Sequence, residues 1–194
     1  MTSTTRAQFL ARGAKGGLAL VAGGAVLGLA EGTAFGAVTS DADIAKLAAT
    51  AELLAIDFYT SAISSKKLTG DELSYLVGAK ENEVAHYNAL KGVLKAATPS
   101  GLKFTYPMGS FASRASIGKL GEALETAFVG AYMGAVGALQ SNALKSVAAE
   151  IGACESRHLS VLTNIAQNAI VPAPSFPTVF TAAKATAAVK PFIA

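Results

Sequence analysis

The stretch Glu83-Val84-Ala85-His86 and its counterpart Glu155-Ser156-Arg157-His158 decide how this chain is interpreted. The sequence has two histidines, and each follows a glutamate by three residues. On an α-helix, positions i and i+3 lie on the same face, so each pair can direct a carboxylate and an imidazole toward one point. One Glu-x-x-His is a weak signal, but two that use every histidine of the chain indicate a metal site shared by two helices.

Apolar residues that recur with helical spacing predict an all-α fold. Long stretches rich in alanine and leucine contain no proline and are separated by short polar or glycine-containing breaks. Four long helices are expected, over about 41–65, 71–97, 117–139 and 143–168. A short helix at 181–189 is expected in the proline-containing tail that follows.

The links between these helices predict their arrangement. The first and last links are short, so each pair of consecutive helices should form an antiparallel hairpin. The middle link, at about 98–116, is an irregular segment with prolines and glycines. About 18 residues can reach roughly 60 Å at 3.3 Å per residue, whereas a 27-residue helix is only about 40 Å long. This link can therefore cross the whole length of a four-helix bundle.

The other two helices each contribute a glutamate at the same depth as the Glu-x-x-His pairs. Glu52 lies 16 residues before the middle of the first turn, and Glu83 lies 15 residues after it. Glu125 and Glu155 each lie 15 residues from Gln140, in the middle of the second turn. At 1.5 Å per residue, all four carboxylates fall roughly 23 Å from their turns. They should therefore meet at one level of the bundle.

Four carboxylates on apolar stripes need a compensating charge. Glu52 has Ala48 and Ala55 beside it at helical spacing, and Glu155 is surrounded by apolar residues in the same way. A buried carboxylate is costly unless it is paired or bound to a cation. No lysine or arginine falls on these stripes, whereas two divalent ions would balance four negative charges, with neutral imidazoles completing the ligand shells. The expected metal-binding and catalytic residues are Glu52, Glu83, His86, Glu125, Glu155 and His158.

Other side chains near these positions are expected to have supporting roles. Tyr59 and Tyr132 each follow a candidate glutamate by seven residues, and core packing is favoured for both over a hydrogen bond to a ligand or a redox role. Cys154 is expected to be a small buried apolar residue and not a ligand. Three glutamates off the ligand pattern are expected to be solvated or to support the ligands: Glu81, Glu122 and Glu150.

These residues resemble those of the ferritin-like superfamily. The matching segments are AELLAIDFY (51–59), ENEVAHYNAL (81–90), LETAFVGAYMGA (124–135) and IGACESRHLSVL (151–162). The ending VKPFIA looks similar too, and the resemblance spans roughly 41–194. Within the superfamily, the chain is similar to secreted bacterial ferritin-like proteins that are related to plant desiccation-related proteins.

This resemblance implies a specific ligand role for each residue of the site. Glu52 and Glu125 would each bind one metal, Glu83 and Glu155 would bridge or chelate the two, and each histidine would complete one ion. The ions would be two iron ions, with manganese as the alternative. The resemblance also implies the ferritin-like topology, in which one long crossover joins the second and third helices of the bundle.

Three functions are compatible with such a site. The first is a di-iron oxidoreductase, ferroxidase-like or oxidase-like, that uses dioxygen or peroxide, with a manganese-catalase-like activity as a variant. The second is a stress-protective or structural protein in which the metal serves stability only. The third is a non-enzymatic surface or assembly protein. Basic residues are scattered and do not alternate with aromatics, so a nucleic-acid partner is not expected. Self-association into a homo-oligomer is left open.

The two ends of the chain are interpreted separately from the bundle. Residues 1–36 carry basic residues followed by an uncharged run at 17–30, which predicts an export signal. The start of this segment resembles a twin-arginine signal, except that Ala7 stands where the second arginine would be. The protein is therefore expected in the periplasm, cell envelope or outside the cell, and an uncleaved membrane anchor is the alternative. The bundle is expected over 41–168, and residues 169–194 are expected to be a tail that packs on it.

Overall fold

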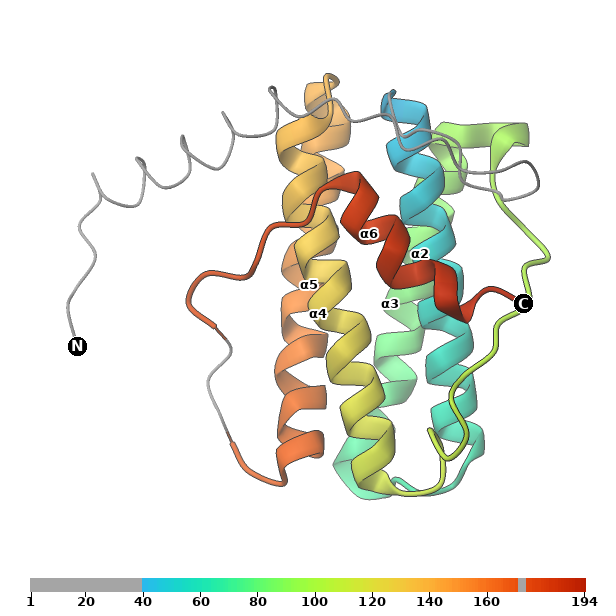
Figure 1. The fold of residues 1–194 in the computed structure, drawn as a ribbon, viewed down its shortest axis with the longest axis vertical. Helices are drawn as coiled ribbons and strands as arrows, with labels where there is room; N and C mark the ends of the chain where they lie inside the picture. The colour runs from blue at the N-terminus through green and yellow to red at the C-terminus, as the bar shows by residue number, and fades with distance from the viewer. Residues whose placement is uncertain (1–39, 171–173) are drawn as a thin grey trace. The chain divides into compact units, whose positions relative to one another are not determined.

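The computed structural model describes residues 40–170 and 174–194, and long helices dominate this part of the chain. Four of them lie side by side as a bundle (Figure 1): α2 (Asp41–Ser64), α3 (Gly70–Leu94), α4 (Arg114–Ala138) and α5 (Asn142–Gln167). The 3-10 turn η1 (Lys95–Ala97) extends α3, and the tail contains α6 (Ala182–Val189) and η2 (Lys190–Phe192). The predicted all-α bundle is confirmed.

Serine side chains begin three of the four long helices. The Ser40 hydroxyl accepts a hydrogen bond from the Asp43 backbone N–H at 3.2 Å, and Ser141 begins α5 in the same manner. At the start of α4, Ser113 and Ser116 form a reciprocal capping box. This cap explains why α4 begins at Arg114, three residues before the predicted start: its first turn is stabilised by polar residues that a search for apolar periodicity passes over.

The long link at 98–113 runs along the bundle from the end of α3 to the start of α4 (Figure 1). Its middle is held by the tail of the chain. Phe104 and Ile193 form an antiparallel bridge, and the Thr105 backbone N–H donates to the Phe192 carbonyl at 2.7 Å. The predicted crossover therefore exists, and it is fixed by backbone pairing that the sequence pattern did not indicate.

Polar contacts tie the hairpins together at both ends of the bundle. At one end, the Asp41 carboxylate accepts hydrogen bonds from the backbone N–H groups of Gln140 at 2.8 Å and Ser141 at 2.9 Å. At the other end, the Arg114 guanidinium donates to the Glu72 carboxylate, with Nε 2.9 Å from Oε2. Each contact joins a residue of one hairpin to the other, so the register of the four helices is set from both ends.

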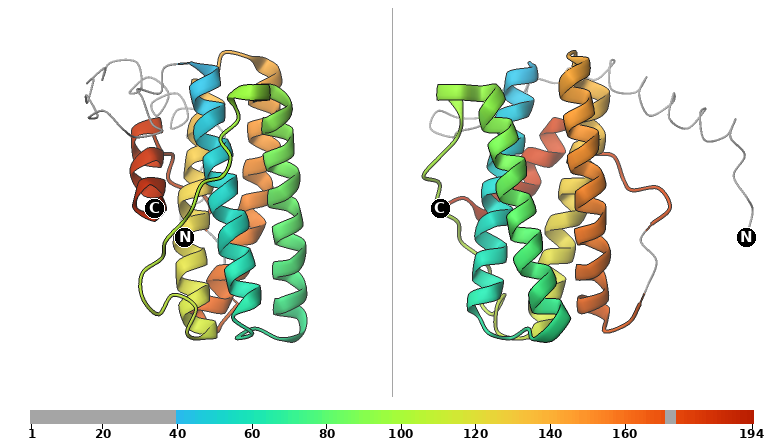
Figure 2. Two further views of the ribbon diagram at one scale, coloured as in Figure 1. Left: turned by 90° about the vertical axis from the view of Figure 1, so that its right-hand side faces the viewer. Right: turned by 180° about the vertical axis from the view of Figure 1, so that it is seen from behind.

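The tail packs on the outside of the bundle through two glycines of α4. The Phe180 backbone N–H donates to the Gly130 carbonyl at 2.9 Å, and α6 then lies against α4 and α2. Seen from behind, α3 and α5 are in front and α6 is on the far side (Figure 2). A Cβ at Gly134 would lie 1.9 Å from the Phe180 carbonyl oxygen, so this close approach requires glycine.

The predicted export signal, residues 1–36, lies outside the described residues. Among residues 40–170 and 174–194, none of the helices is both long enough and apolar enough to cross a membrane.

The close contact at Gly134 makes a testable prediction. Gly134→Ala should push Phe180 away from α4 and lower the free energy of unfolding by about 1–3 kcal/mol, the usual cost of overpacking. Chemical denaturation of the purified protein measures this change. Gly137→Ala is the matched control, because a Cβ there meets nothing within 4 Å, and it should leave stability unchanged or raise it slightly. Equal effects of the two substitutions would show that the tail does not rest on Gly134.

Candidate metal centre

The six side chains singled out in the sequence come together in the middle of the bundle. α2 supplies Glu52 and α4 supplies Glu125, while α3 and α5 each supply a glutamate and a histidine. The four carboxylates and His158 are almost fully buried, with exposed fractions of 2% or less. His86 is slightly more open, with 13% of its side chain exposed. All six therefore face the interior, and a solvent-facing position is found for none of them.

The two Glu-x-x-His pairs interlock across the bundle. Within each helix, the imidazole Nδ1 lies near its own glutamate, at 3.2 Å for His86 and Glu83 and at 3.0 Å for His158 and Glu155. Each Nδ1 also approaches the glutamate of the other helix, at 3.2 Å for His86 and Glu155 and at 2.8 Å for His158 and Glu83. The i, i+3 spacing thus places both imidazoles against the same two carboxylates.

Two overlapping sets of ligand atoms result, and within each set the atoms lie within 4.8 Å of one another. The first set is Glu52, Glu83, His86 and Glu155. The second set is Glu83, Glu125, Glu155 and His158. Glu83 and Glu155 belong to both sets and therefore lie between two adjacent positions, each completed by one further glutamate and one histidine. These positions are compatible with the ligand assignment that the family resemblance implies, which stays a prediction.

Burial controls the protonation of three of the carboxylates. It raises the pKa of Glu52 and of Glu125, and the neighbouring Glu155 charge raises both further. Burial also raises the pKa of Glu83, to about 10, against the opposing effect of His86. With no cation present, burial therefore favours the protonated form of all three groups, and Glu83 keeps its proton at neutral pH.

For Glu155 and the two histidines, contacts with neighbouring charged groups outweigh the effect of burial on the pKa. Burial alone would raise the pKa of Glu155, but contacts with His158 and His86 outweigh it, and the pKa is lowered. Burial would lower the pKa of each histidine, but the carboxylates around it, Glu155 first, raise it instead. In the absence of metal, the two imidazoles thus favour the ionised form of Glu155, and Glu155 favours the protonated form of each imidazole.

When all four carboxylates are ionised, as metal binding requires, the donors around them do not complete this cluster. One buried oxygen on each of the four glutamates accepts no hydrogen bond: Glu52 Oε2, Glu83 Oε1, Glu125 Oε2 and Glu155 Oε1. Imidazole nitrogens lie near some of these oxygens, but each Nδ1 has at most one N–H to donate. Buried acceptors without a donor are costly and are rare in folded proteins. The donor set, four carboxylates and two imidazoles, fits two divalent cations of the iron or manganese type.

Two tyrosines form hydrogen bonds between α2 and α4 to the outer glutamates, Glu52 and Glu125, which each belong to one ligand set only. The Tyr59 hydroxyl on α2 donates to Glu125 Oε1 on α4 at 2.6 Å, and the Tyr132 hydroxyl on α4 donates to Glu52 on α2. Both rings are buried, as packing required. The preference for packing over a hydrogen bond to a ligand was wrong, however, because both hydroxyls bond to the carboxylates. The two Glu-x₆-Tyr spacings were a visible signal, since seven residues make two helical turns and keep both side chains on one face.

The far side of His158 has polar neighbours that sequence reasoning missed. Its Nε2 lies 3.2 Å from the Asn82 side-chain amide and 3.7 Å from the Cys154 sulfur. Cys154 is buried, as predicted, and it also accepts a hydrogen bond from Arg157 at 3.1 Å. If Nδ1 binds a metal, Nε2 carries a proton, and the amide oxygen of Asn82, once turned toward it, would accept that proton. Cys154 precedes His158 by four residues, one turn along the same face, so its position was foreseeable.

Three further glutamates that the sequence analysis considered lie outside both ligand sets. Glu81 and Glu150 are exposed, and Glu122 is partly exposed and accepts a long hydrogen bond from Gln167. None of the three belongs to either ligand set, in agreement with their predicted role as solvated groups.

The family model for a ferritin-like domain matches residues 40–168. The chain belongs to the ferritin-like family. The matched region contains all four long helices and all six residues of the centre. No curated protein matches the chain. Family membership accounts for the bundle and its long crossover, and the buried cluster of this ferritin-like protein is compatible with a two-metal site.

The raised pKa values predict how stability depends on pH in the metal-free protein. Between the ordinary value of 4.5 and about 10, folded Glu83 holds a proton that the unfolded chain has released. The free energy of unfolding should therefore fall as pH rises through this range, by up to about 1.4 kcal/mol per pH unit for one proton. Urea denaturation of metal-free protein at several pH values measures the slope.

Two variants on α3 test the origin of this slope. Glu83→Gln removes one titrating group and should reduce the slope, because this buried side chain is then neutral at every pH and only the other groups of the cluster still titrate. Glu81→Gln, two residues away and exposed, should leave the slope as in wild type. A Glu83→Gln protein with the wild-type slope would mean that Glu83 is already ionised in the folded state.

Proposed function

We propose that this ferritin-like protein binds two metal ions in the buried cluster, iron in the first place, and oxidises ferrous iron. The observation that carries the proposal is the pair of overlapping ligand sets that share Glu83 and Glu155. Two sets with common carboxylates place two ions next to each other, which suits the two-electron reduction of an oxygen species. Manganese has the same preference for carboxylate and imidazole and remains the alternative metal.

The positions of the six residues suggest which ion each of them would bind. Glu52 with His86, and Glu125 with His158, would each serve one ion, and Glu83 and Glu155 would hold both. A pair of ferrous ions held there would supply the two electrons that reduce dioxygen with two protons to hydrogen peroxide, or hydrogen peroxide with two protons to water. Four ionised carboxylates offset the four positive charges of two divalent ions, so the bound cluster is electrically balanced.

The surrounding side chains would keep these ligands in position. The hydroxyls of Tyr59 and Tyr132 each occupy one oxygen of an outer glutamate and leave the other oxygen without a donor. That free oxygen is the one available to a metal. Because the ligands must lose their protons to bind, metal uptake should release protons and should strengthen as pH rises.

Burial of the centre also supports a second candidate function. Five of the six side chains are exposed by 2% or less, which suits a metal that holds the bundle together without turnover. In that case, the protein would be stress-protective or structural, as the resemblance to desiccation-related proteins suggests. Metal would then raise the melting temperature, while ferrous iron would be oxidised no faster than in buffer.

Metal binding and oxidation give a direct test of the proposal. Wild-type protein should bind two ions per chain, and metal in 100-fold excess over its dissociation constant should stabilise the fold by about 2.7 kcal/mol. His86→Ala and His158→Ala should each weaken binding of one ion and slow iron oxidation. Elemental analysis, thermal melts and dioxygen consumption with Fe(II) are the measurements.

The outcomes separate the candidates. Two bound ions with no oxidation of Fe(II) by either dioxygen or peroxide would favour the structural function, and no bound metal in wild type would exclude both. Glu150→Gln is a suitable control because Glu150 is exposed and outside both ligand sets. This variant should match wild type in every measurement.

We also propose that the chain is exported and belongs with the secreted, desiccation-related branch of the family. The support is the basic and then apolar segment at 1–36 and the family resemblance of the four helix motifs. An exported metal-binding protein would meet ferrous iron and dioxygen outside the cytoplasm.

Export can be tested in cells that make the full chain. Mass spectrometry of the exported protein should find a mature N-terminus near Ala37 or Val38, just after the predicted signal. Full-length chain recovered from the membrane fraction would instead show that the segment is kept as an anchor. Protein found intact in the cytoplasm would contradict export altogether.

A further inference from the structure

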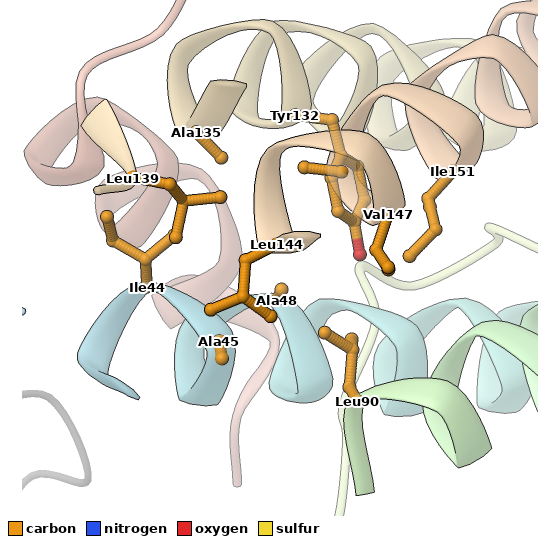
Figure 3. Close-up of a pocket in the computed structure, with 11 residues that line it drawn as sticks. Ile44, Ala45, Ala48, Leu90, Tyr132, Ala135, Leu139, Leu144, Val147 and Ile151 are labelled. Carbon is orange, nitrogen blue, oxygen red and sulfur yellow. The ribbon is translucent and has the colours of Figure 1, made fainter. Parts of the chain in front are cut away.

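A small apolar pocket lies between the metal centre and the end of the bundle where α2 begins and α4 turns into α5 (Figure 3). All four long helices contribute to it. Its lining consists of Ile44, Ala45, Ala48, Leu90, Tyr132, Ala135, Leu139, Leu144, Val147, Ala148 and Ile151. The Tyr132 hydroxyl is the only polar group among these side chains. The free volume of the pocket is about 20 Å³, enough for one very small molecule.

The floor of this pocket is the layer of side chains directly next to the metal centre. Ala48 lies four residues before Glu52, and Ile151 lies four residues before Glu155. Leu90 likewise follows the histidine of α3 by four residues. Positions four apart lie on one face of a helix, one turn along. Three helices therefore place a pocket residue one turn from a ligand, and the pocket and the centre share a wall.

Tyr132 forms the polar part of that wall. Its ring lines the pocket among Leu90, Val147 and Ile151 (Figure 3). Its hydroxyl donates to Glu52. A molecule in the pocket thus lies against a side chain that is hydrogen-bonded to a proposed ligand. No other residue of the lining makes a hydrogen bond to the centre in the part of the chain that the structure describes.

Both buried and partly exposed residues line the pocket. Ile44 and Leu144, at the end of the bundle, and Ala48, next to the centre, are partly exposed, whereas Ala148 and Ile151 are buried. The pocket is therefore accessible from the surface of the bundle. By contrast, the ligands themselves are almost closed to solvent.

We propose that this pocket admits dioxygen and holds it beside the metal centre, so that dioxygen and not peroxide is the oxidant. Apolar cavities of this kind exclude water and take up apolar gases such as xenon. Peroxide would lose its hydrogen bonds to water on entering and find only one hydroxyl in return. The volume is too small for a hydrocarbon chain. The inference rests on the proposed function, because it names the oxidant for the same centre.

Xenon tests the pocket without any turnover. Xenon-pressurised crystals of the full chain should show one xenon atom in contact with Ala148 and Tyr132. Ala148→Val fills the pocket and should abolish this site. Ala149→Val is the matched control, since it adds the same side chain at the next, exposed position of α5, and it should keep the xenon. A wild-type pocket that takes up no xenon would overturn the inference.

The oxidant is tested by comparing two reactions of the iron-loaded protein. Ala148→Val should slow iron oxidation by dioxygen severalfold and leave oxidation by hydrogen peroxide unchanged. Ala149→Val should match wild type with both oxidants. Leu144→Ala, which widens the pocket, should keep xenon and should not slow the dioxygen reaction, and it tests the same pocket if Ala148→Val folds poorly.

Other results would overturn the inference in distinguishable ways. A wild type that oxidises iron with peroxide but not with dioxygen would leave the metal centre intact and exclude this role for the pocket. If Ala148→Val slows iron oxidation equally with both oxidants, this role for the pocket is likewise excluded. A wild type that oxidises iron with neither oxidant would overturn the proposed function, and this inference with it.

Discussion

The burial of four carboxylates at one level of the bundle is the constraint on which the rest of this structure depends. Glu83, Glu125 and Glu155 have no measurable exposure, and Glu52 has almost none. Without metal, burial favours the protonated form of Glu52, Glu83 and Glu125, and contacts with the two imidazoles favour the ionised form of Glu155. When all four are ionised, one oxygen on each has no hydrogen-bond donor. The protein tolerates the cost because the rest of the bundle holds the four helices in fixed register.

That register comes from contacts at every level of the bundle. Asp41 joins the start of α2 to the α4–α5 turn, and Arg114 joins the start of α4 to α3 at the opposite end. Between them, Tyr59 and Tyr132 link α2 and α4 in both directions. Since each of these contacts joins one hairpin to the other, the two ligand sets cannot drift apart. The outer glutamates thereby stay aimed at the centre without a bound ion.

The fold and the cluster were largely predictable because both depend on helical spacing. Apolar periodicity and the breaks between apolar stretches placed the helices within a few residues, and counting from the turns placed the glutamates at one depth. The capping box at Ser113, the bridge from Phe104 to Ile193 and the neighbours of His158 were not predicted. A cap built from two serines has no apolar pattern, and contacts between distant segments depend on the assembled bundle. That the six residues bind metal stays a prediction.

The bridge between Phe104 and Ile193 also affects the order in which the parts of the chain fold. The α2–α3 and α4–α5 hairpins join neighbouring segments and can form early, as local contacts generally do. The crossover, in contrast, is paired with residues 89 positions later in the chain (193 − 104). During synthesis, both hairpins can therefore be complete while the crossover still lacks its partner. Closure of the crossover is a late event that waits for the tail.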